Sequence, residues 1–383
     1  MSGPLQGLRV IEMAGIGPAP YACMLLSDLG AEVIRIDRIN GGGLDGHPGD
    51  VTARGRQSIA VNLKDPEGID IVLQLIASAD VLVECYRPGV MEKLGLGPEV
   101  CGKRNPRLIY GRMTGWGQDG PMAKTAGHDI NYIAISGLLA SFGAAGEAPP
   151  TPLNVIGDLG GGSMFLLLGI LAALQERHQS GLGQVIDAAI CDGTASLLST
   201  IHGLKGIQFW ANERENNVLD GGAPFYRSYL CRDGRSMSVG AIEPHFYSQL
   251  LETLDLDFGG SDYSTQMDKA KWPAQRAKMA AKFLEKTRDE WAELFSGSDA
   301  CAAPVLDLDE AESFSHNAYR KNLIRRDKVL QSAPAPRFSR TPGTIQHSPV
   351  AEGENTLSIL ASLGMHEKVI ADMVVKGVIK QAE

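Results

Sequence analysis

The segment LRVIEMAGIGPAPYACMLLSDLGAEVIRID, residues 8–37, decides the fold of this chain. Its first residues, Leu8–Met13, are mainly apolar and branched, which is typical of a buried strand. A helical pattern then runs from 20 to 29, and a second strand-like run follows at Glu32–Asp37. A strand, a helix and a strand joined by such short turns predict a βαβ unit with parallel strands.

Gly15 and Gly17 follow the first strand, where a dinucleotide-binding turn would place its first two glycines. Pro18, Ala19 and Pro20 come next, and the third glycine of that fingerprint is missing. The sequence therefore favours a tight turn between strand and helix over a nicotinamide site.

The alternation of strands and helices continues along the first part of the chain. Strand-like runs occur at 58–63, 81–84 and 108–111, and Asp65 with Pro66 provides the N-cap and first residue of another helix. This order predicts a large, doubly wound, Rossmann-like α/β domain. Ligands of such sheets bind beyond the carboxyl ends of the strands, and five basic residues stand near predicted strand ends: Arg38, Arg54, Arg56, Lys64 and Arg87.

The character of the sequence changes from Gly221 onward. Residues 212–220 are polar and irregular, as in a linker, and the runs 224–231 and 236–240 flank Asp233-Gly234, a strong hairpin signal. Helical patterns follow at 243–254, 271–285 and 287–297, the last with Thr287 and Glu290 as a capping box. We expect a smaller α+β domain here.

Composition excludes several classes of partner. The chain has 383 residues, is 44% hydrophobic and carries a formal net charge of −9, so neither nucleic acid nor an anionic membrane is expected as a main partner. The six cysteines form no Cys-x-x-Cys pair and the eight histidines no His-Glu-x-x-His motif, so no metal is expected. The longest apolar run, 161–174, is shorter than the roughly 18 residues of a membrane span. With no secretion signal or peroxisomal address visible, we expect a cytoplasmic protein.

Two short segments place ionisable side chains where apolar helices are predicted to begin. GHDINY at 127–132 puts His128 and Asp129 in a first turn, and GDLGGGSM at 157–164 puts Asp158 before a helix starting at Met164. Helix N-termini offer unpaired N–H groups that suit a developing oxyanion. An imidazole and a carboxylate at two such points could act as opposed bases on one carbon.

Four sequence words resemble one known family. AGHDINY at 126–132, LNVIGD at 153–158, LDGGAP at 219–224 and VGAIEP at 239–244 are similar to those of the α-methylacyl-CoA racemases, which belong to the family III (CaiB/BaiF-type) CoA-transferases. The resemblance runs from about Leu5 to about Phe338 in the family's order.

The resemblance implies an isomerase that racemises 2-methylacyl-CoA thioesters through an enolate, with neither metal nor redox cofactor. His128 and Asp158 would be the two bases, and burial should raise the pKa of the Asp158 carboxyl. Glu243, contributed by the other subunit, would orient His128. The backbone N–H of Asp129 would hold the thioester oxygen.

The resemblance also implies how CoA is bound. Arg38 and the run Val61, Asn62, Leu63 and Lys64 match positions that hold CoA in the racemases, and arginine suits its phosphates. The other residues expected at the substrate are Glu84, Arg87, Gly127, Ile130, Asn131, Tyr132 and Asn154.

From the family we expect an interlocked homodimer with shared active sites. The expected division is a large CoA-binding domain over 1–211 with His128 and Asp158, a small domain over 212–330 with Glu243, and a segment over 331–383 that returns to the large domain. The sequence does not choose among sterol, branched fatty or aryl-propionyl acyl chains.

Two other functions stay open. In a family III CoA-transferase, the residue matching Asp158 would attack the thioester as a nucleophile. His128 argues against this, because those enzymes generally lack the GHDIN word, and Gly259-Gly260 is too short for their glycine-rich loop. The chain could also bind acyl-CoA without catalysis. Cys301 has no histidine near it in sequence, so we expect a packed thiol.

Overall fold

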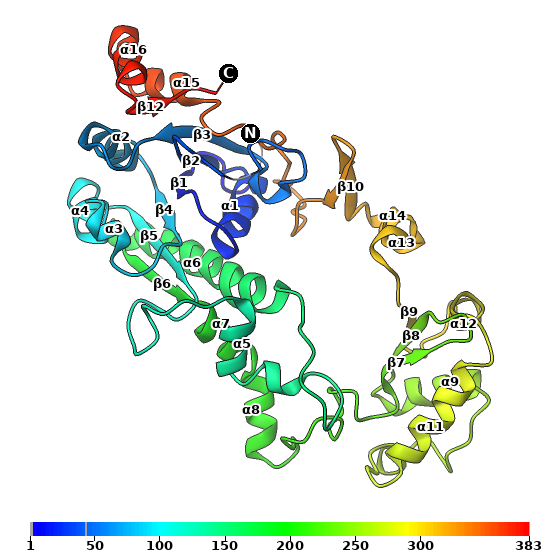
Figure 1. Ribbon diagram of the computed structural model, residues 1–383. Coiled ribbons are helices and arrows are strands. Elements are labelled where there is room, and N and C mark those ends of the chain that lie inside the picture. The colour runs from blue at the N-terminus through cyan, green and yellow to red at the C-terminus, as the bar shows by residue number, and fades with distance from the viewer. Residues whose placement is uncertain (1–2, 43, 383) are drawn as a thin grey trace. The chain divides into compact units, whose positions relative to one another are not determined.

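A computed structural model describes residues 3–42 and 44–382 of the chain. It divides into two compact units (Figure 1). The first unit runs to Ser136, takes up Pro152–Leu197 and ends with the chain from Ser315 onward, and the second comprises Gly137–Thr151 and Leu198–Phe314. Relative to the expected ranges, residues 137–151 and 198–211 group with the smaller unit and 315–330 with the larger one.

A seven-stranded sheet forms the centre of the first unit. Its order is β12-β3-β2-β1-β4-β5-β6; every neighbouring pair is parallel except the edge pair of β12 and β3. The expected α/β fold with a mostly parallel sheet is thus confirmed. The strand order reverses between β1 and β4, which opens a crevice at their carboxyl ends. The strands are β1 (Arg9–Met13), β2 (Glu32–Arg38), β3 (Arg56–Val61), β4 (Val81–Glu84), β5 (Ile109–Thr114), β6 (Val185–Ala189) and β12 (Ile379–Lys380).

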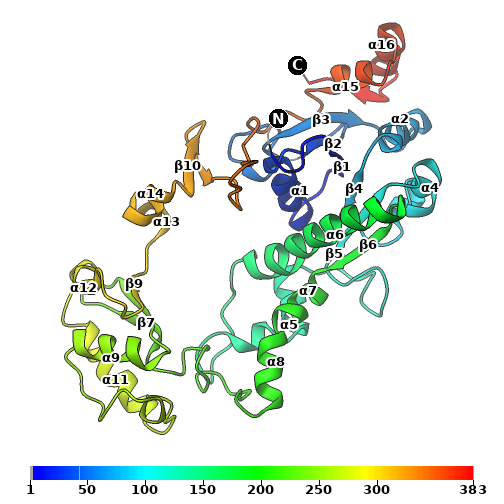
Figure 2. The ribbon, with the colours of Figure 1, turned by 180° about the vertical axis from the view of Figure 1, so that it is seen from behind.

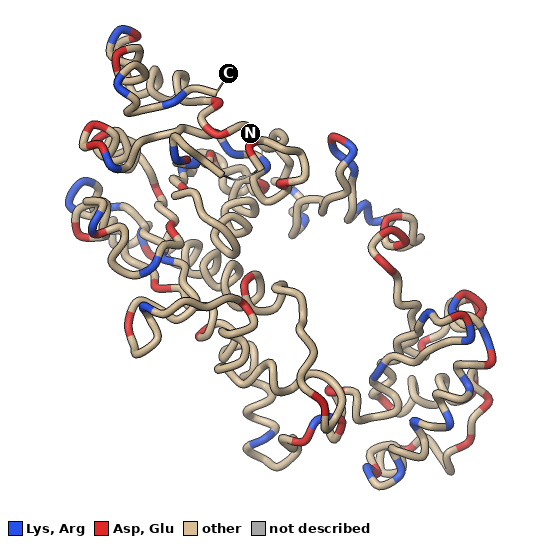
Figure 3. The backbone as a smooth tube through the Cα atoms, in the orientation of Figure 1, with Lys and Arg blue, Asp and Glu red and all other residues tan. Residues whose placement is uncertain are grey.

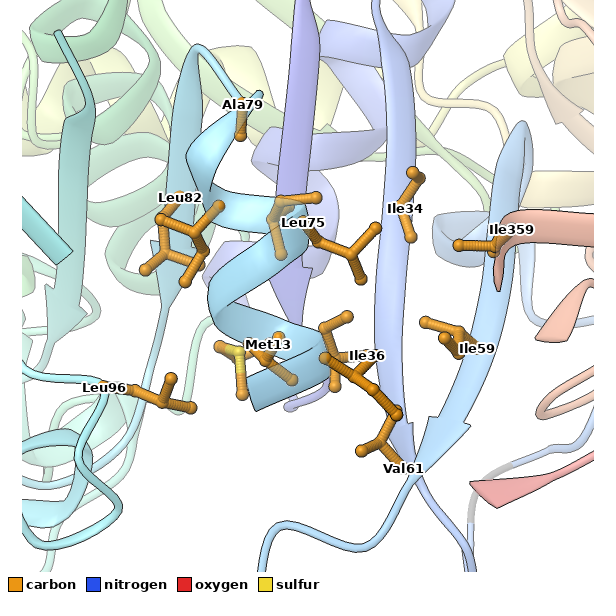
Figure 4. Close-up of a cluster of buried hydrophobic side chains, with 14 of the residues drawn as sticks. Met13, Ile34, Ile36, Ile59, Val61, Leu75, Ala79, Leu82, Leu96 and Ile359 are labelled. Atoms are coloured by element: carbon orange, nitrogen blue, oxygen red, sulfur yellow. The ribbon is translucent and has the colours of Figure 1, made fainter. Parts of the chain in front are cut away.

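Side chains alternate between two cores, one on each face of the sheet. Ile11 and Leu82 join one core, whereas their neighbours Val10 and Val83 join the other. The first core packs under α2 (Pro66–Ala77), α4 (Pro98–Arg104), α15 (Thr356–Ser362) and α16 (Glu367–Val375), as Figure 4 shows in part. The second packs under α1 (Pro18–Asp28) and α6 (Met164–Ser180), which lie together in Figures 1 and 2.

Local contacts fix the start of α2 and the C-terminal end of the chain in the first unit. Asp65 caps α2 as predicted, accepting a hydrogen bond from the Glu67 N–H at 2.9 Å. The C-terminal residues lie on this unit, because β12 pairs with β3 at the sheet edge. The other elements are a 3-10 turn (Val51–Ala53), α3 (Val90–Lys93), α5 (Asp129–Ile135), α7 (Ile190–Leu197), α14 (Ser315–Arg320), β10 (Leu323–Arg326) and β11 (Val329–Ser332).

The glycine-rich run before α6 is itself helical, whereas the sequence predicted a helix that starts only at Met164. Val155–Ser163 forms a π-helix that continues into α6. Together Val155–Ser180 span 26 residues and contain an 18-residue window with a mean hydropathy of 1.8, so length and composition alone would allow this helix to cross a membrane, against the expectation from the shorter apolar run. Core helices pass the same test, and Leu166, Ile170 and Leu174 of α6 are buried against the sheet.

The second unit is a small α+β structure. The hairpin of β7 (Tyr226–Leu230) and β8 (Ser236–Gly240) is extended by β9 (Ala302–Pro304), all antiparallel. The capping box is present, since the Glu290 carboxylate accepts the Thr287 N–H at 2.7 Å. Figure 3 shows acidic and basic residues interspersed within each unit. The helices are α8 (Ser199–Gly206), α9 (Pro244–Thr253), α10 (Tyr263–Gln266), α11 (Trp272–Phe283), α12 (Arg288–Phe295) and α13 (Leu308–Ser313), with a 3-10 turn at Leu139–Ser141.

Candidate active site

Three adjoining cavities of the first unit open near the carboxyl ends of its parallel strands. One, of about 320 Å³, is lined by His128, Asp129 and Asp158. Another, of about 600 Å³, is lined by Arg38 and the run Val61–Lys64, and a third, of about 460 Å³, shares Arg38 with it. Tyr86, which follows β4, lines all three. The structure thus brings the predicted bases into one cavity and the predicted CoA residues into a neighbouring one.

The two candidate bases stand at the starts of two packed helical segments. His128 is the exposed N-cap of α5, and Asp158 is partly buried in the π-helical segment. The Asp158 N–H donates to Oδ1 of Asp129, the first residue of α5, at 2.7 Å. On the other side, Asn154 Nδ2 donates to Asp158 Oδ2 at 3.2 Å. One carboxylate oxygen of Asp158 is therefore held by a neutral amide.

Burial raises the pKa of the Asp158 carboxyl from its ordinary value, as the sequence predicted. The hydrogen bond from Asn154 lowers this pKa, the charge of Asp129 raises it and His128 lowers it, and the net direction is upward. Burial also raises the pKa of Asp129, against the backbone N–H groups of Asp158 and Gly157 that stabilise its charged form. The result is a carboxylate at position 158 that binds a proton more readily than a solvated one.

Aromatic rings form the wall behind His128. The Tyr132 hydroxyl donates to the Gly127 carbonyl, and the Tyr132 and Trp116 rings meet edge to face with centroids 4.6 Å apart. A Cβ at Gly127 would lie 2.8 Å from atoms of both rings, so a larger residue would push this wall away from the cavity. Burial, and then the charge of Asp158, raise the pKa of the Tyr132 hydroxyl.

Two other residues of the predicted GHDINY group lie outside the described walls of these cavities. Ile130 is 36% exposed, and the Asn131 side chain accepts the His128 backbone N–H at 3.1 Å. Among the residues that line the three cavities in the described chain, neither appears. The structure therefore assigns Asn131 to holding the start of α5.

The predicted CoA residues occupy the larger cavity beside the sheet edge. Asn62 Oδ1 accepts the Lys64 N–H at 3.1 Å, and the Asn62 N–H donates to the Val378 carbonyl at 2.8 Å, just before β12. The C-terminal segment thereby shapes the loop after β3. Arg38 is exposed at the end of β2, and Arg87 is exposed on the wall of the cavity that holds His128.

Glu84 lies beneath these cavities without reaching their surface. It is 0% exposed; its Oε1 accepts from Arg112 Nε at 3.0 Å and its Oε2 from the Tyr86 N–H at 2.7 Å. Burial raises the pKa of this carboxyl, while Tyr86 and Arg112 stabilise its charged form. Glu84 therefore orients the loop of Tyr86 and Arg87, which line the catalytic cavity.

Arg54 and Arg56, which stand near predicted strand ends as Arg38 does, line none of the three cavities in the described part of the chain. Arg54 pairs with Asp28 at 2.5 Å and Arg56 with Glu12 at 2.9 Å, and both guanidinium groups are buried. Each is neutralised by its carboxylate, and Arg54 also donates to Gln331 at 2.8 Å. These arginines hold the fold.

Glu243 and Cys301 lie in the second unit. Glu243 is the exposed N-cap of α9, and the buried Gln266 side chain donates to the carbonyls of Ala241 and Ile242 just before it. Its contact with His128 stays a prediction. Cys301 is exposed, not packed as expected, and it adopts a φ of 49° just before β9. Burial, then Glu243, raise the pKa of its thiol, which disfavours a nucleophilic thiolate.

Residues 5–356 match the family model described as CoA-transferase family III. The chain belongs to this family. It is 44% identical to the mouse protein named alpha-methylacyl-CoA racemase over 96% of each chain, and 42% identical to the human protein of the same name over 96% of this chain and 95% of that one. Among solved structures, a CAIB/BAIF family protein from Brucella suis superposes with a TM-score of 0.81 at 26% identity, covering 95% of this chain and 100% of the other.

Several residues at this family III site were not predicted from the sequence. Ile16, Cys85, Tyr86 and Trp116 line the cavity of the two bases. Burial raises the pKa of the Cys85 thiol to about 12, so this cysteine stays protonated. Ile16 and Tyr86 follow β1 and β4, the two strands at which the sheet order reverses, and that position was the available signal.

Proposed function

We propose that this chain is an α-methylacyl-CoA racemase, which interconverts the (2R) and (2S) epimers of 2-methylacyl-CoA thioesters. The observation that carries the proposal is the meeting of His128 and Asp158 in one cavity of about 320 Å³. The names of the relatives at 44% and 42% identity support the same reaction.

In the proposed reaction each base serves one face of C2. One base removes the C2 proton while the C–H electron pair moves toward the thioester carbonyl and forms an enolate. The protonated partner then returns a proton to the opposite face, so no atom is gained or lost. The raised pKa of Asp158 favours this role, because a solvated carboxylate is a weaker base toward carbon.

The enolate oxygen needs a donor, and we assign it to the backbone N–H of Asp129. This residue is the first of α5, where backbone N–H groups have no partner within the helix. An N–H held in place before the reaction stabilises charge that develops on the oxygen. With this donor, the acidity of the C2 proton comes from the thioester, and the proposed mechanism uses neither a metal nor a redox cofactor.

The CoA portion serves as a handle in this proposal. Arg38 and Lys64 line the cavity of about 600 Å³ and supply positive charge for the phosphates of CoA. Arg87 stands on the wall of the catalytic cavity, and Tyr86 lines both spaces. The pantetheine arm would pass Tyr86 on its way to the bases.

We infer that the active protein is a cytoplasmic homodimer in which the second copy supplies Glu243 to His128. Large apolar side chains exposed around Asp158 support a covered surface here: Ile16 is 81% exposed, Leu153 76% and Val155 49%. A carboxylate against the imidazole would fix its tautomer and stabilise the imidazolium formed in turnover.

The main rival is a CoA-transferase, the activity after which the family is described. The Asp158 carboxylate would then attack the thioester carbon, expel CoA as a thiolate and carry the acyl group as an anhydride. The geometry offers no special role to His128 in that step, which is why we prefer racemisation.

The deciding experiment incubates one epimer of a 2-methylacyl-CoA with the protein in D2O and follows deuterium at C2 together with stereochemistry. Deuterium uptake with conversion to an epimeric mixture, without added acceptor, is the expected result. Transfer of labelled CoA to an added free acid, without exchange, would establish the transferase. Measurable binding with neither reaction would leave a non-catalytic acyl-CoA binding protein.

A further inference from the structure

The Asp129 side chain connects the two segments that carry the proposed bases. It is 8% exposed, and its Oδ1 accepts the Asp158 N–H at 2.7 Å. The neighbouring Gly157 N–H also stabilises its charged form. A Cβ at Gly157 would lie 2.1 Å from the same oxygen, so only glycine leaves room for this contact. The Asp129 carboxylate therefore holds the backbone of the turn that carries Asp158 by hydrogen bonds.

We propose that the Asp129 carboxylate is a positioning residue, which clamps the Asp158 turn to the first turn of α5 and so sets the spacing of the two bases. The inference rests on the proposed racemase function. It goes beyond that function, because there Asp129 acts only through its backbone N–H.

The Asp158 turn needs such a clamp because of its own backbone. Val155–Ser163 is π-helical, a geometry rarely adopted beyond one turn, and it contains Gly157 and the run Gly160–Gly162. Glycines leave the free chain the most conformational freedom, so the turn depends on contacts from outside. A partly buried carboxylate that accepts backbone N–H groups forms strong, charge-assisted hydrogen bonds.

The clamp also changes the charge around Asp158. The groups that face this carboxylate are the Asn154 amide, the Asp129 carboxylate, the His128 imidazole and the Tyr132 hydroxyl. Among the charged ones, Asp129 raises the pKa of Asp158 and His128 lowers it. Two substitutions at position 129 can therefore separate the effect of the Asp129 charge from the effect of its hydrogen bond with the Asp158 N–H.

The test compares Asp129→Asn and Asp129→Ala in the D2O assay, with kcat, KM and the pH profile measured for each epimer. Asp129→Asn keeps an acceptor oxygen, so most of kcat should remain, while loss of the charge moves the acid limb to lower pH. Asp129→Ala removes the acceptor, and kcat should fall about a hundredfold with KM nearly unchanged, since small misplacements of reacting groups have effects of this size. The matched controls are Asp119→Asn and Asp119→Ala, at an exposed acidic residue of the same unit. These variants should leave kcat and KM unchanged.

A structural readout tests the clamp without activity. Amide hydrogen exchange at Gly157 and Asp158 should rise in Asp129→Ala and stay low in Asp129→Asn. Wild-type kcat in Asp129→Ala, or equal effects of both substitutions without a shift of the acid limb, would overturn the proposal. If the alanine variant does not fold, Gly157→Ala takes its place in both measurements, because its new Cβ would lie 2.1 Å from Asp129 Oδ1; wild-type kcat and wild-type amide exchange in that variant would overturn the proposal. A wild-type protein that shows no exchange or racemisation instead contradicts the proposed function, and amide exchange then still judges the clamp.

Discussion

The two segments that carry the proposed bases are built in opposite ways. Before α5, His128 is exposed, and its backbone N–H is held by Asn131, three residues away in the same short helix. Asp158 is partly buried, and its turn is held by other elements: Asp129 accepts its N–H, and Ser163 Oγ donates to the Pro18 carbonyl at 2.7 Å.

In our proposal the two bases also differ in whether one chain supplies all of their surroundings: Asp158 finds its neighbours within the first unit, whereas His128 takes one of its own from a second copy. The two causes that raise the pKa of Asp158, burial and the charge of Asp129, both lie within the first unit, as does Asn154, whose hydrogen bond lowers this pKa. His128 presents its imidazole to solvent, so the group that orients its ring comes from a partner, which in our proposal is Glu243 of a second copy. Substitutions should therefore affect the two bases differently.

The largest effect should come from removing either base. His128→Ala and Asp158→Asn should each reduce racemisation by about 10²–10⁴-fold, the range for loss of a positioned acid or base. Each variant should still exchange the C2 proton of one epimer, with retention, because the remaining base serves one face. Proton NMR in D2O with each pure epimer measures this. Exchange of both epimers by both variants would contradict the two-base arrangement.

A smaller loss is expected from Gly157→Ala, which leaves both bases in place. The new Cβ would meet Asp129 Oδ1 at 2.1 Å and push the carboxylate from the Asp158 turn. We expect kcat to fall about a hundredfold with little change in KM, because the spacing of the bases changes. Gly102→Ala in α4 is the matched control, since its Cβ would enter open space, and activity should not change. Normal kcat in Gly157→Ala would show that the turn tolerates displacement.

The parallel sheet could be predicted because its strands are buried on both faces. Runs such as Leu8–Met13 and Glu32–Asp37 are rich in apolar, branched residues, and the structure places strands at Arg9–Met13 and Glu32–Arg38. The π-helical segment could not be predicted, since its glycines favour a loop. It forms because Gly161 packs against α7, where a Cβ would lie 2.5 Å from Thr194. That neighbour is invisible to local propensity.

Site residues could be predicted where a short sequence motif contains them. They could not be predicted where an ion pair with a residue far away in the chain determines the role of a side chain. His128 and Asp158 came from words of six or seven residues. Arg54 and Arg56 stood near predicted strand ends just as Arg38 did, but their carboxylate partners are 26 and 44 residues away in the chain. Sequence position therefore gives the end of the sheet at which a cation stands, and tertiary structure gives its partner.

Arg38 and Arg56 offer the next comparison, of an exposed arginine with a buried one. Arg38→Ala should raise KM for the acyl-CoA about tenfold and leave kcat unchanged, because it removes ground-state binding of a phosphate. The difference from wild type should shrink at high salt. Arg56→Ala should instead lower the free energy of unfolding by about 3–5 kcal/mol, because it leaves Glu12 buried without its partner. Substrate titration and urea unfolding distinguish the two. An unchanged KM in Arg38→Ala would remove this residue from the CoA site.

The smallest effect concerns the stability cost of holding Asp158 ready as a base. Its pKa is raised in the folded protein, so the folded state binds the proton more tightly than the unfolded state. That contribution to stability is present below the ordinary pKa of a carboxyl, about 4, and is lost as pH rises through the raised value. Asp158→Asn cannot ionise, so it should melt about 2 °C higher than wild type at neutral pH, with the difference vanishing in acid.

His128→Ala is the matched comparison for this measurement. Its imidazole is exposed in the chain, and the Asn131 contact that holds α5 uses the backbone N–H, which alanine keeps. The melting temperature should therefore stay at the wild-type value across the same pH range. Equal shifts of the melting temperature in both variants would mean that the local surroundings of Asp158 do not lower the stability of the fold. A rise confined to Asp158→Asn would support a base whose setting is built, at some loss of stability, within the first unit alone.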